Sequence, residues 1–97
     1  MKKNILGKTG LEVSRLGIGL SEIGFNFTNN DFSTAEKVLN VALDKGINFL
    51  DTAACYDISE ETIGSAVSYR RNDYILATKA GHYLPRGEGE DWTYELI

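Results

Sequence analysis

An acid, a phenol and an amine follow the ends of two apolar segments and together could transfer a proton. Asp51 ends the apolar stretch that begins at Ile47, and Tyr56 lies shortly after it. Lys79 ends a second apolar stretch, which begins at Tyr74. Strands of a parallel sheet read as nearly continuous apolar runs, so a charged last residue is expected at the rim. Ligands of parallel α/β proteins bind at the carboxyl ends of the strands, and the three side chains are therefore expected to share one site.

These three residue types would adjust one another's protonation. An ionised Asp51 beside Lys79 keeps the ammonium charged, and an ammonium near Tyr56 favours the phenolate. That charge lowers a tyrosine pKa from its reference value of about 10. A phenol tuned in this way donates and retrieves a proton near neutral pH, as reduction of a carbonyl group requires. Taken singly, each residue is better explained as a rim ion pair or a packed tyrosine, so the prediction rests on the combination.

A helix is predicted upstream of Asp51. Ser33 and Glu36 match the capping box that begins many helices, and Gly46 supplies the left-handed residue that often ends them. Apolar residues recur on one face of this segment: Ala35, Val38, Leu39, Ala42 and Leu43.

A second helix is predicted after Tyr56. Ser59 is a good N-cap, and Arg70 and Arg71 suit the negative end of the helix dipole. Its narrow apolar face consists of Ile63, Ala66 and Val67.

The order of the remaining elements predicts a parallel sheet with helical crossovers. Strands are expected at residues 15–19, 47–51 and 74–79, and this spacing of roughly thirty residues is typical of βαβ units. A β-hairpin around residues 7–10 precedes them, and residues 20–30 read as a loop.

The last residues indicate an incomplete domain. Residues 81–91 read as a polar loop, and Trp92 to Ile97 resemble the first turn of a helix. Three parallel strands also leave sheet edges and apolar faces uncovered. We therefore expect residues 1–97 to be a truncated fragment of one larger α/β domain.

Composition excludes several classes of function. The 97 residues are 42% hydrophobic and 25% charged, which is typical of a globular domain. A net charge of −4 without a basic stripe predicts no nucleic-acid partner. No long apolar run or signal peptide is recognisable, so no membrane partner is expected. The single cysteine, Cys55, allows no internal disulfide, and no metal-ligand spacing occurs, which favours a cytoplasmic protein without a metal.

In its motifs the chain resembles the N-terminal part of the aldo-keto reductases, with a looser likeness to members of the aldose and galactose dehydrogenase type. The resemblance runs in order and with the right spacing through four segments: residues 6–19, 46–56, 59–64 and 76–81. It implies a (β/α)8 TIM barrel, of which the first three βα units, preceded by a hairpin, would be present here.

The resemblance also implies roles for individual residues. Tyr56 corresponds to the proton donor, Lys79 to the residue that lowers its pKa, and Asp51 to the partner of the lysine and a contact near the nicotinamide ribose. Gly19, Leu20 and Ser21 correspond to backbone beside the nicotinamide. The expected cofactor is NADPH, or alternatively NAD, and the expected substrate is a small carbonyl compound, alcohol or sugar.

Two departures from the family pattern bear on activity. The family histidine follows the fourth strand, whereas His82 follows the third and is interpreted as a loop residue. Asp57 stands where many members have glycine. The residues that hold the adenosine phosphate come from later strands, so the 97 residues alone are expected to be inactive.

Two other interpretations remain open from the sequence. Gly17 and Gly19 begin a Rossmann-like fingerprint, but Glu22 replaces its third glycine and no helix is predicted directly after it. The second is a truncated, non-catalytic remnant. Measurable activity would distinguish an enzyme from such a remnant, whereas motifs would not. The resemblance also implies that the loops that choose the substrate lie mostly outside residues 1–97.

Overall fold

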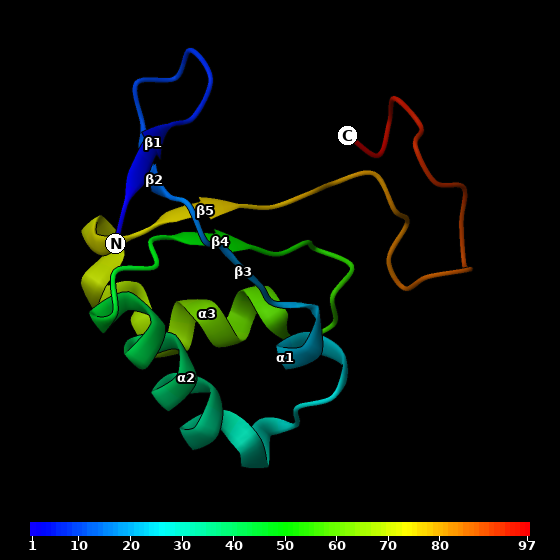
Figure 1. Ribbon diagram of the computed structural model, residues 1–97. Coiled ribbons are helices and arrows are strands. Elements are labelled where there is room, and N and C mark those ends of the chain that lie inside the picture. Colours follow the sequence, from blue (N-terminus) through cyan, green and yellow to red (C-terminus); the bar gives the residue numbers. More distant parts are fainter.

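The computed structural model describes the backbone of residues 1–97 and every side chain except that of Asn29. Its central feature is a three-stranded parallel sheet in the order β3 (Ile18–Gly19), β4 (Phe49–Asp51) and β5 (Ile75–Ala77). Helices α1 (Ser21–Phe25), α2 (Phe32–Asp44) and α3 (Ser59–Val67) lie on one side of this sheet (Figure 1). The predicted parallel sheet with helical crossovers is confirmed.

Only one face of the sheet is covered, as expected for three parallel strands of an incomplete domain. In β4, Leu50 is fully buried against the helices, whereas Phe49 and Asp51 are half-buried. Successive side chains of a strand point to opposite faces, so the half-buried pair faces away from the helices. The face that carries Asp51 is therefore accessible.

The hydrophobic core lies between the sheet and the helices. Its fully buried large side chains include Leu20, Leu39, Leu50, Ile63 and Val67. Predicted apolar positions of both helices are confirmed, except that Val38 is 42% exposed.

The predicted capping box of α2 is wrong. The helix begins at Phe32, so that Ser33 lies inside its first turn and caps nothing. Upstream, the Asp31 carboxylate accepts hydrogen bonds from the Thr28 amide at 2.7 Å and the Thr28 hydroxyl at 3.1 Å. This local turn, next to a short 3₁₀ helix (Asn29–Asp31), sets where α2 begins. The predicted end is confirmed, because Gly46 has φ +95°.

Ser59 is not the N-cap of α3 but its first helical residue. Its buried hydroxyl donates to the carbonyl of Leu20 at 2.8 Å and lies 2.7 Å from the hydroxyl of Thr52. The side chain therefore joins three segments of the body instead of capping its own helix.

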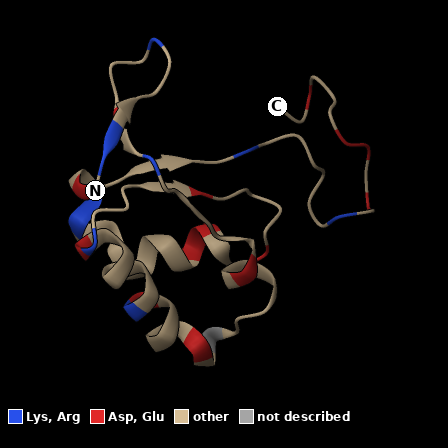
Figure 2. Cartoon of the chain, viewed as in Figure 1, with Lys and Arg blue, Asp and Glu red and all other residues tan. Residues whose placement is uncertain are grey.

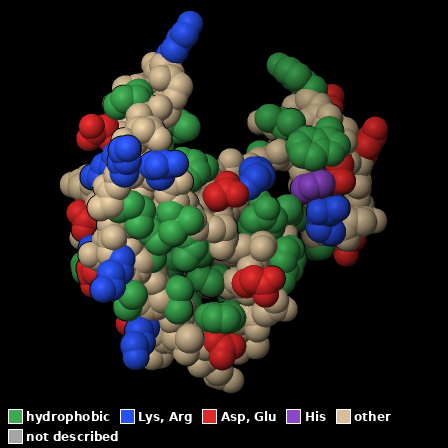
Figure 3. All heavy atoms as spheres, in the orientation of Figure 1, with side chains coloured by type: hydrophobic (Ala, Val, Ile, Leu, Met, Phe, Trp, Pro, Cys, Tyr) green, Lys and Arg blue, Asp and Glu red, His purple; other side chains and the backbone are tan. Residues whose placement is uncertain are grey.

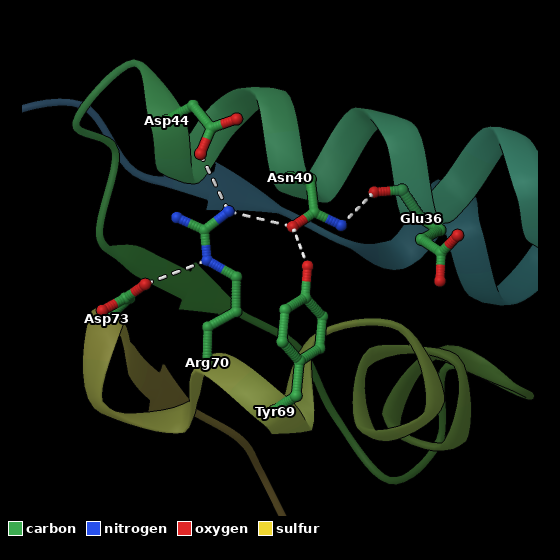
Figure 4. Close-up of polar contacts among 6 residues, drawn as sticks. All are labelled: Glu36, Asn40, Asp44, Tyr69, Arg70 and Asp73. Carbon is green, nitrogen blue, oxygen red and sulfur yellow. Dashed lines mark hydrogen bonds and ion pairs between the residues drawn. The ribbon is translucent and has the colours of Figure 1, made fainter.

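A polar cluster links α2 to the 3₁₀ helix (Ser68–Asp73) that follows α3. Arg70 donates to Asp44, Asp73 and Asn40, each at 2.9 Å, and Tyr69 donates to Asn40 at 2.8 Å (Figure 4). Arg70 thus binds specific carboxylates, which the predicted role at the helix dipole did not include.

The predicted hairpin is confirmed as β1 (Lys3–Ile5) and β2 (Glu12–Ser14), which pair antiparallel. Asn48, just before β4, attaches it to the sheet. Its side chain accepts from the Ser14 amide at 2.7 Å and donates to the Glu12 carbonyl at 2.9 Å, and its amide donates to the Ser14 hydroxyl at 3.0 Å.

Two predicted loop and helix assignments are wrong. Residues 20–30 contain α1, which begins at Ser21, because Ile23 packs into the core and Gly24 lies against the loop of Tyr56. Trp92 does not begin a helix, since its φ of +62° is left-handed and its amide donates to the Gly81 carbonyl at 2.6 Å.

The segment after Lys79 forms no helix or strand, so two βα units and a third strand are present. We call residues 80–97 the arm and residues 1–79 the body. Figure 1 shows the arm, in orange and red, extending from β5, and Figure 3 shows a hollow between it and the hairpin.

Candidate active site

The backbone brings Asp51 and Lys79 side by side at the ends of two neighbouring strands. Asp51 pairs with Ala77 in the parallel register, and Lys79 follows two residues later. Pairing continues past the strands, because the Thr52 amide donates to the Ala77 carbonyl at 2.8 Å and the Ala54 amide to that of Lys79 at 3.2 Å. Lys79 and Ala77 therefore point to the same face as Asp51.

The three predicted catalytic residues lie together. The Lys79 Nζ donates to Asp51 Oδ1 at 3.0 Å and to the Thr52 carbonyl at 2.9 Å. The same nitrogen lies 5.2 Å from the centre of the Tyr56 ring. In Figure 2 acidic and basic segments approach each other where β4 and β5 end. An amine, a carboxylate and a phenol thus converge at one edge of the sheet.

The charges at this edge hold Lys79 in its ammonium form. The hydrogen bond to Asp51 is the main cause that raises the pKa of Lys79 above 10.5, and Tyr56 adds a smaller contribution in the same direction. The side chains of Lys79 and Asp51 are 51% and 44% exposed, so solvent screens the pair and it contributes little to stability. An ion pair of little structural value at a strand end is a candidate for chemistry.

The loop that carries Tyr56 is held by buried backbone contacts. The Tyr56 carbonyl accepts from the Ser59 amide at 2.9 Å, and the Tyr56 amide donates to the Ala53 carbonyl at 3.1 Å. A β-carbon on Gly24 would lie only 1.7 Å from the Tyr56 carbonyl oxygen. A glycine is therefore required at position 24 for α1 to approach this loop so closely.

Asp57 has φ +47°. Aspartate tolerates this left-handed conformation better than most residues other than glycine and asparagine. The backbone of this loop therefore retains a shape suited to glycine although the residue is different.

The predicted cofactor-binding residues lie next to this site but differ in accessibility. Gly19 pairs with Asp51 in the sheet, is exposed, and has open space beside its α-carbon. Ser21 is half-buried at the start of α1. Leu20 is fully buried, and its amide and carbonyl are bonded to the Asp51 carbonyl and the Ser59 hydroxyl, respectively. Gly19 and Ser21 therefore have surfaces that can contact a ligand, whereas Leu20 mainly fixes the backbone between them.

A cleft of about 360 Å³ opens between Tyr56 and the arm. Body residues Tyr56 and Lys79 line it together with arm residues His82, Leu84 and Trp92. The sequence interpretation of His82 as a loop residue holds, but it did not include this cleft. The signal that could have found it is the position of His82 three residues after Lys79, on the loop that leaves the same edge.

Two absences hold for the described residues. No group of three or more His, Cys, Asp and Glu side chains is arranged to hold a metal ion there. Nor does any described helix have the length and apolarity needed to cross a membrane.

Comparison with known proteins gives one consistent result. The sequence pattern of the Aldo/keto reductase family matches residues 15–96. The chain is 39% identical to the Bacillus subtilis oxidoreductase YqkF, with 98% of this chain and 30% of that protein covered. It is also 39% identical to the L-galactose dehydrogenase of Arabidopsis thaliana, with 95% and 30% covered.

A solved structure shares the arrangement of elements. A putative aldo-keto reductase from Pseudomonas aeruginosa superposes with a TM-score of 0.75 at 33% identity, over 89% of this chain and 34% of that one. The chain thus spans about a third or less of the length of the relatives it matches. On this match over most of its residues, the chain belongs to the aldo/keto reductase family.

Proposed function

We propose that residues 1–97 form the N-terminal part of a single (β/α)8 barrel domain that interconverts carbonyl compounds and alcohols with NADPH, or alternatively NADH. The observation that carries this proposal is the contact of Lys79 with Asp51 and with the ring of Tyr56 at the carboxyl end of the sheet. Barrel enzymes place their catalytic groups at this end.

The residues present fit one edge of a nicotinamide site. Gly19 offers an open backbone edge opposite Asp51, and the Ser21 hydroxyl lies beside it in the chain. When bound, the dinucleotide supplies the hydride that reaches the carbonyl carbon. These residues include no free cation for a 2′-phosphate, since Lys79 is bonded to Asp51, so they do not discriminate NADPH from NADH.

In this proposal Tyr56 delivers the proton. Its phenol donates to the carbonyl oxygen as negative charge develops there, and the Lys79 ammonium stabilises the charge left on the phenolate. Asp51 keeps Lys79 charged and, with the Thr52 carbonyl, fixes the position of its Nζ. In the reverse direction the phenolate accepts the proton of an alcohol.

The proposed substrate is a small carbonyl compound, alcohol or sugar. The cleft beside Tyr56 has the size of a small-molecule site, and one relative is an L-galactose dehydrogenase. The single cysteine supports a cytoplasmic location, because reduced thiols persist there.

The test uses a chimera in which residues 1–97 replace the matching segment of full-length YqkF. We expect NADPH-dependent reduction of an aldehyde, and we expect Tyr56→Phe to lower kcat by about 10²- to 10⁴-fold while NADPH binding is retained. Tyr94→Phe is the matched control, because Tyr94 is 94% exposed and lies outside the cleft. Equal turnover by the Tyr56→Phe and control chimeras would refute the proposed role of Tyr56.

The 97-residue chain alone is expected to show no turnover. Hydride transfer needs a positioned cofactor, and the chain supplies one edge of its site. Turnover by the isolated chain would show that this edge is sufficient.

A further inference from the structure

The arm closes a loop whose geometry holds one imidazole in place. The Trp92 amide donates to the Gly81 carbonyl at 2.6 Å, and the Trp92 ring packs so closely that a β-carbon on Gly81 would lie 1.9 Å from it. His82 Nδ1 lies 3.0 Å from Asp91 Oδ2, and its ring is 4.8 Å from that of Trp92. The other carboxylate oxygen of Asp91 accepts from the Tyr83 amide at 2.7 Å.

This arrangement determines which atom of His82 a ligand can use. A carboxylate only accepts hydrogen bonds, so in the neutral imidazole the proton lies on Nδ1 and is donated to Asp91. The remaining ring nitrogen, Nε2, is then a hydrogen-bond acceptor. The ring is held by Asp91 and Trp92 before any ligand arrives, which reduces the entropy lost on binding.

The same imidazole lines the cleft that Tyr56 and Lys79 line. The other arm residues of that cleft are mainly apolar, including Leu84, Trp92 and Leu96. A substrate whose carbonyl oxygen meets Tyr56 would place its neighbouring carbons against this wall. His82 is the polar side chain that the arm contributes there.

We propose that His82 is a specificity-determining residue whose Nε2 accepts a hydrogen bond from a hydroxyl next to the reacting carbonyl, so that the cleft selects hydroxylated aldehydes and ketones. This inference rests on the proposed function. A site that bonds a hydroxyl of its substrate discriminates against an analogue that lacks this hydroxyl, because the partner in the site is then left unpaired.

Two substitutions at position 82 separate this role from a purely structural one. In His82→Asn the amide can still donate to Asp91, so the loop is retained while the Nε2 position is lost. In His82→Gln the longer amide reaches the Nε2 position but gives up the contact with Asp91. Glu88→Gln is the matched control, because Glu88 is an exposed arm residue that does not line the cleft.

The experiment measures kcat/KM of the YqkF chimera for lactaldehyde and propanal, which differ by the hydroxyl next to the carbonyl. The parent chimera and the Glu88→Gln control are expected to prefer lactaldehyde about tenfold, as one hydrogen bond predicts. His82→Asn should abolish this preference by raising the KM for lactaldehyde, with the KM for propanal unchanged. His82→Gln should retain part of the preference. Loss of the preference in His82→Gln but not in His82→Asn would show that His82 only closes the loop and would overturn the inference.

A second readout does not depend on catalysis. His82 is the single histidine, so the imidazole ¹⁵N resonances of the 97-residue chain report on it alone. Lactamide, an unreactive analogue, should shift the Nε2 resonance, and propanamide should not. If the chimera reduces neither aldehyde, the proposed function fails, and the lactamide titration still decides whether His82 binds a hydroxyl. Equal shifts with both amides, or no shift with either, would overturn the inference.

Discussion

The body and the arm contribute to the same cleft but are held by different kinds of contact. Every buried hydrophobic side chain among the described residues lies between Leu20 and Tyr74, in the body. The arm is held by a few polar contacts around Asp91 and by packing of Trp92 on Gly81. The groups proposed for proton transfer are therefore fixed by the core. The group proposed for substrate selection lies on the arm, where we expect substitutions to leave the core intact.

Removing side-chain volume from the core should lower the stability of the chain more than any of the substitutions that follow. Leu39 is fully buried on α2, and Leu39→Ala is expected to lower the free energy of unfolding by about 2–5 kcal/mol. Urea unfolding followed by far-UV circular dichroism measures this loss. Leu84→Ala, on the arm, is the counterpart and should leave the urea midpoint nearly unchanged. Similar losses for both variants would show that the arm is part of the core.

Adding a β-carbon at the close contact beside Tyr56 should cause the next largest loss of stability. Gly24→Ala forces a β-carbon against the Tyr56 carbonyl oxygen and should cost about 1–3 kcal/mol through displacement of the loop. Gly64→Ala is the matched control, because it lies in α3 with open space around it and should stabilise the helix slightly. Equal stability of the two variants in urea would mean that the loop yields freely.

The buried hydroxyl pair should contribute a smaller amount. Ser59→Ala leaves the Leu20 carbonyl and the Thr52 hydroxyl without this partner and should cost about 1–3 kcal/mol, towards the lower end. Ser65→Ala, at an exposed position of the same helix, serves as the control in the same urea titration. A loss no larger than that of the control would indicate that the two hydroxyls find other partners.

The arm should respond to acid independently of the body. The hydrogen bond from the Tyr83 amide, followed by that from His82, lowers the pKa of Asp91 below its ordinary value of 3.8. Because the pKa of Asp91 is lowered in the folded arm, its carboxylate stabilises the arm at pH values above the ordinary pKa of 3.8. This contribution is lost as the pH falls through the lowered pKa. Trp92, the single tryptophan, should therefore change its fluorescence below about pH 3.8.

Asp91→Asn is the control for this acid transition, because an amide does not titrate. Its Trp92 fluorescence should stay constant over the same pH range, with circular dichroism showing that the helices persist. An acid transition of equal size in Asp91→Asn would assign the change to other carboxyl groups.

The sequence predicted the features that depend on strong periodicity or on strand order. The burial of Leu39, Leu43 and Ile63 and the meeting of Asp51 with Lys79 follow from helical spacing and from parallel strands that end at one edge. The register alone places these two charges together, so no knowledge of side-chain packing was needed.

Features decided by contacts between distant segments could not be predicted. Helix α1 is only five residues long and is fixed by packing of Ile23 and Gly24. Ser59 resembles an N-cap locally, but its hydroxyl bonds Leu20, thirty-nine residues away. Trp92 shows the same effect, because its contact with Gly81 imposes a left-handed backbone that ends any helical turn there.

The cleft between body and arm also provides its own spectroscopic reporters. Cys55, His82 and Trp92 each occur once in the chain, and all three line this cleft. A dye coupled to the thiol of Cys55 would lie close to the indole of Trp92, so quenching of the dye by the indole would report whether the two groups are in contact. The contact between the body and the arm can thus be probed in solution without adding or removing any other reporter residue.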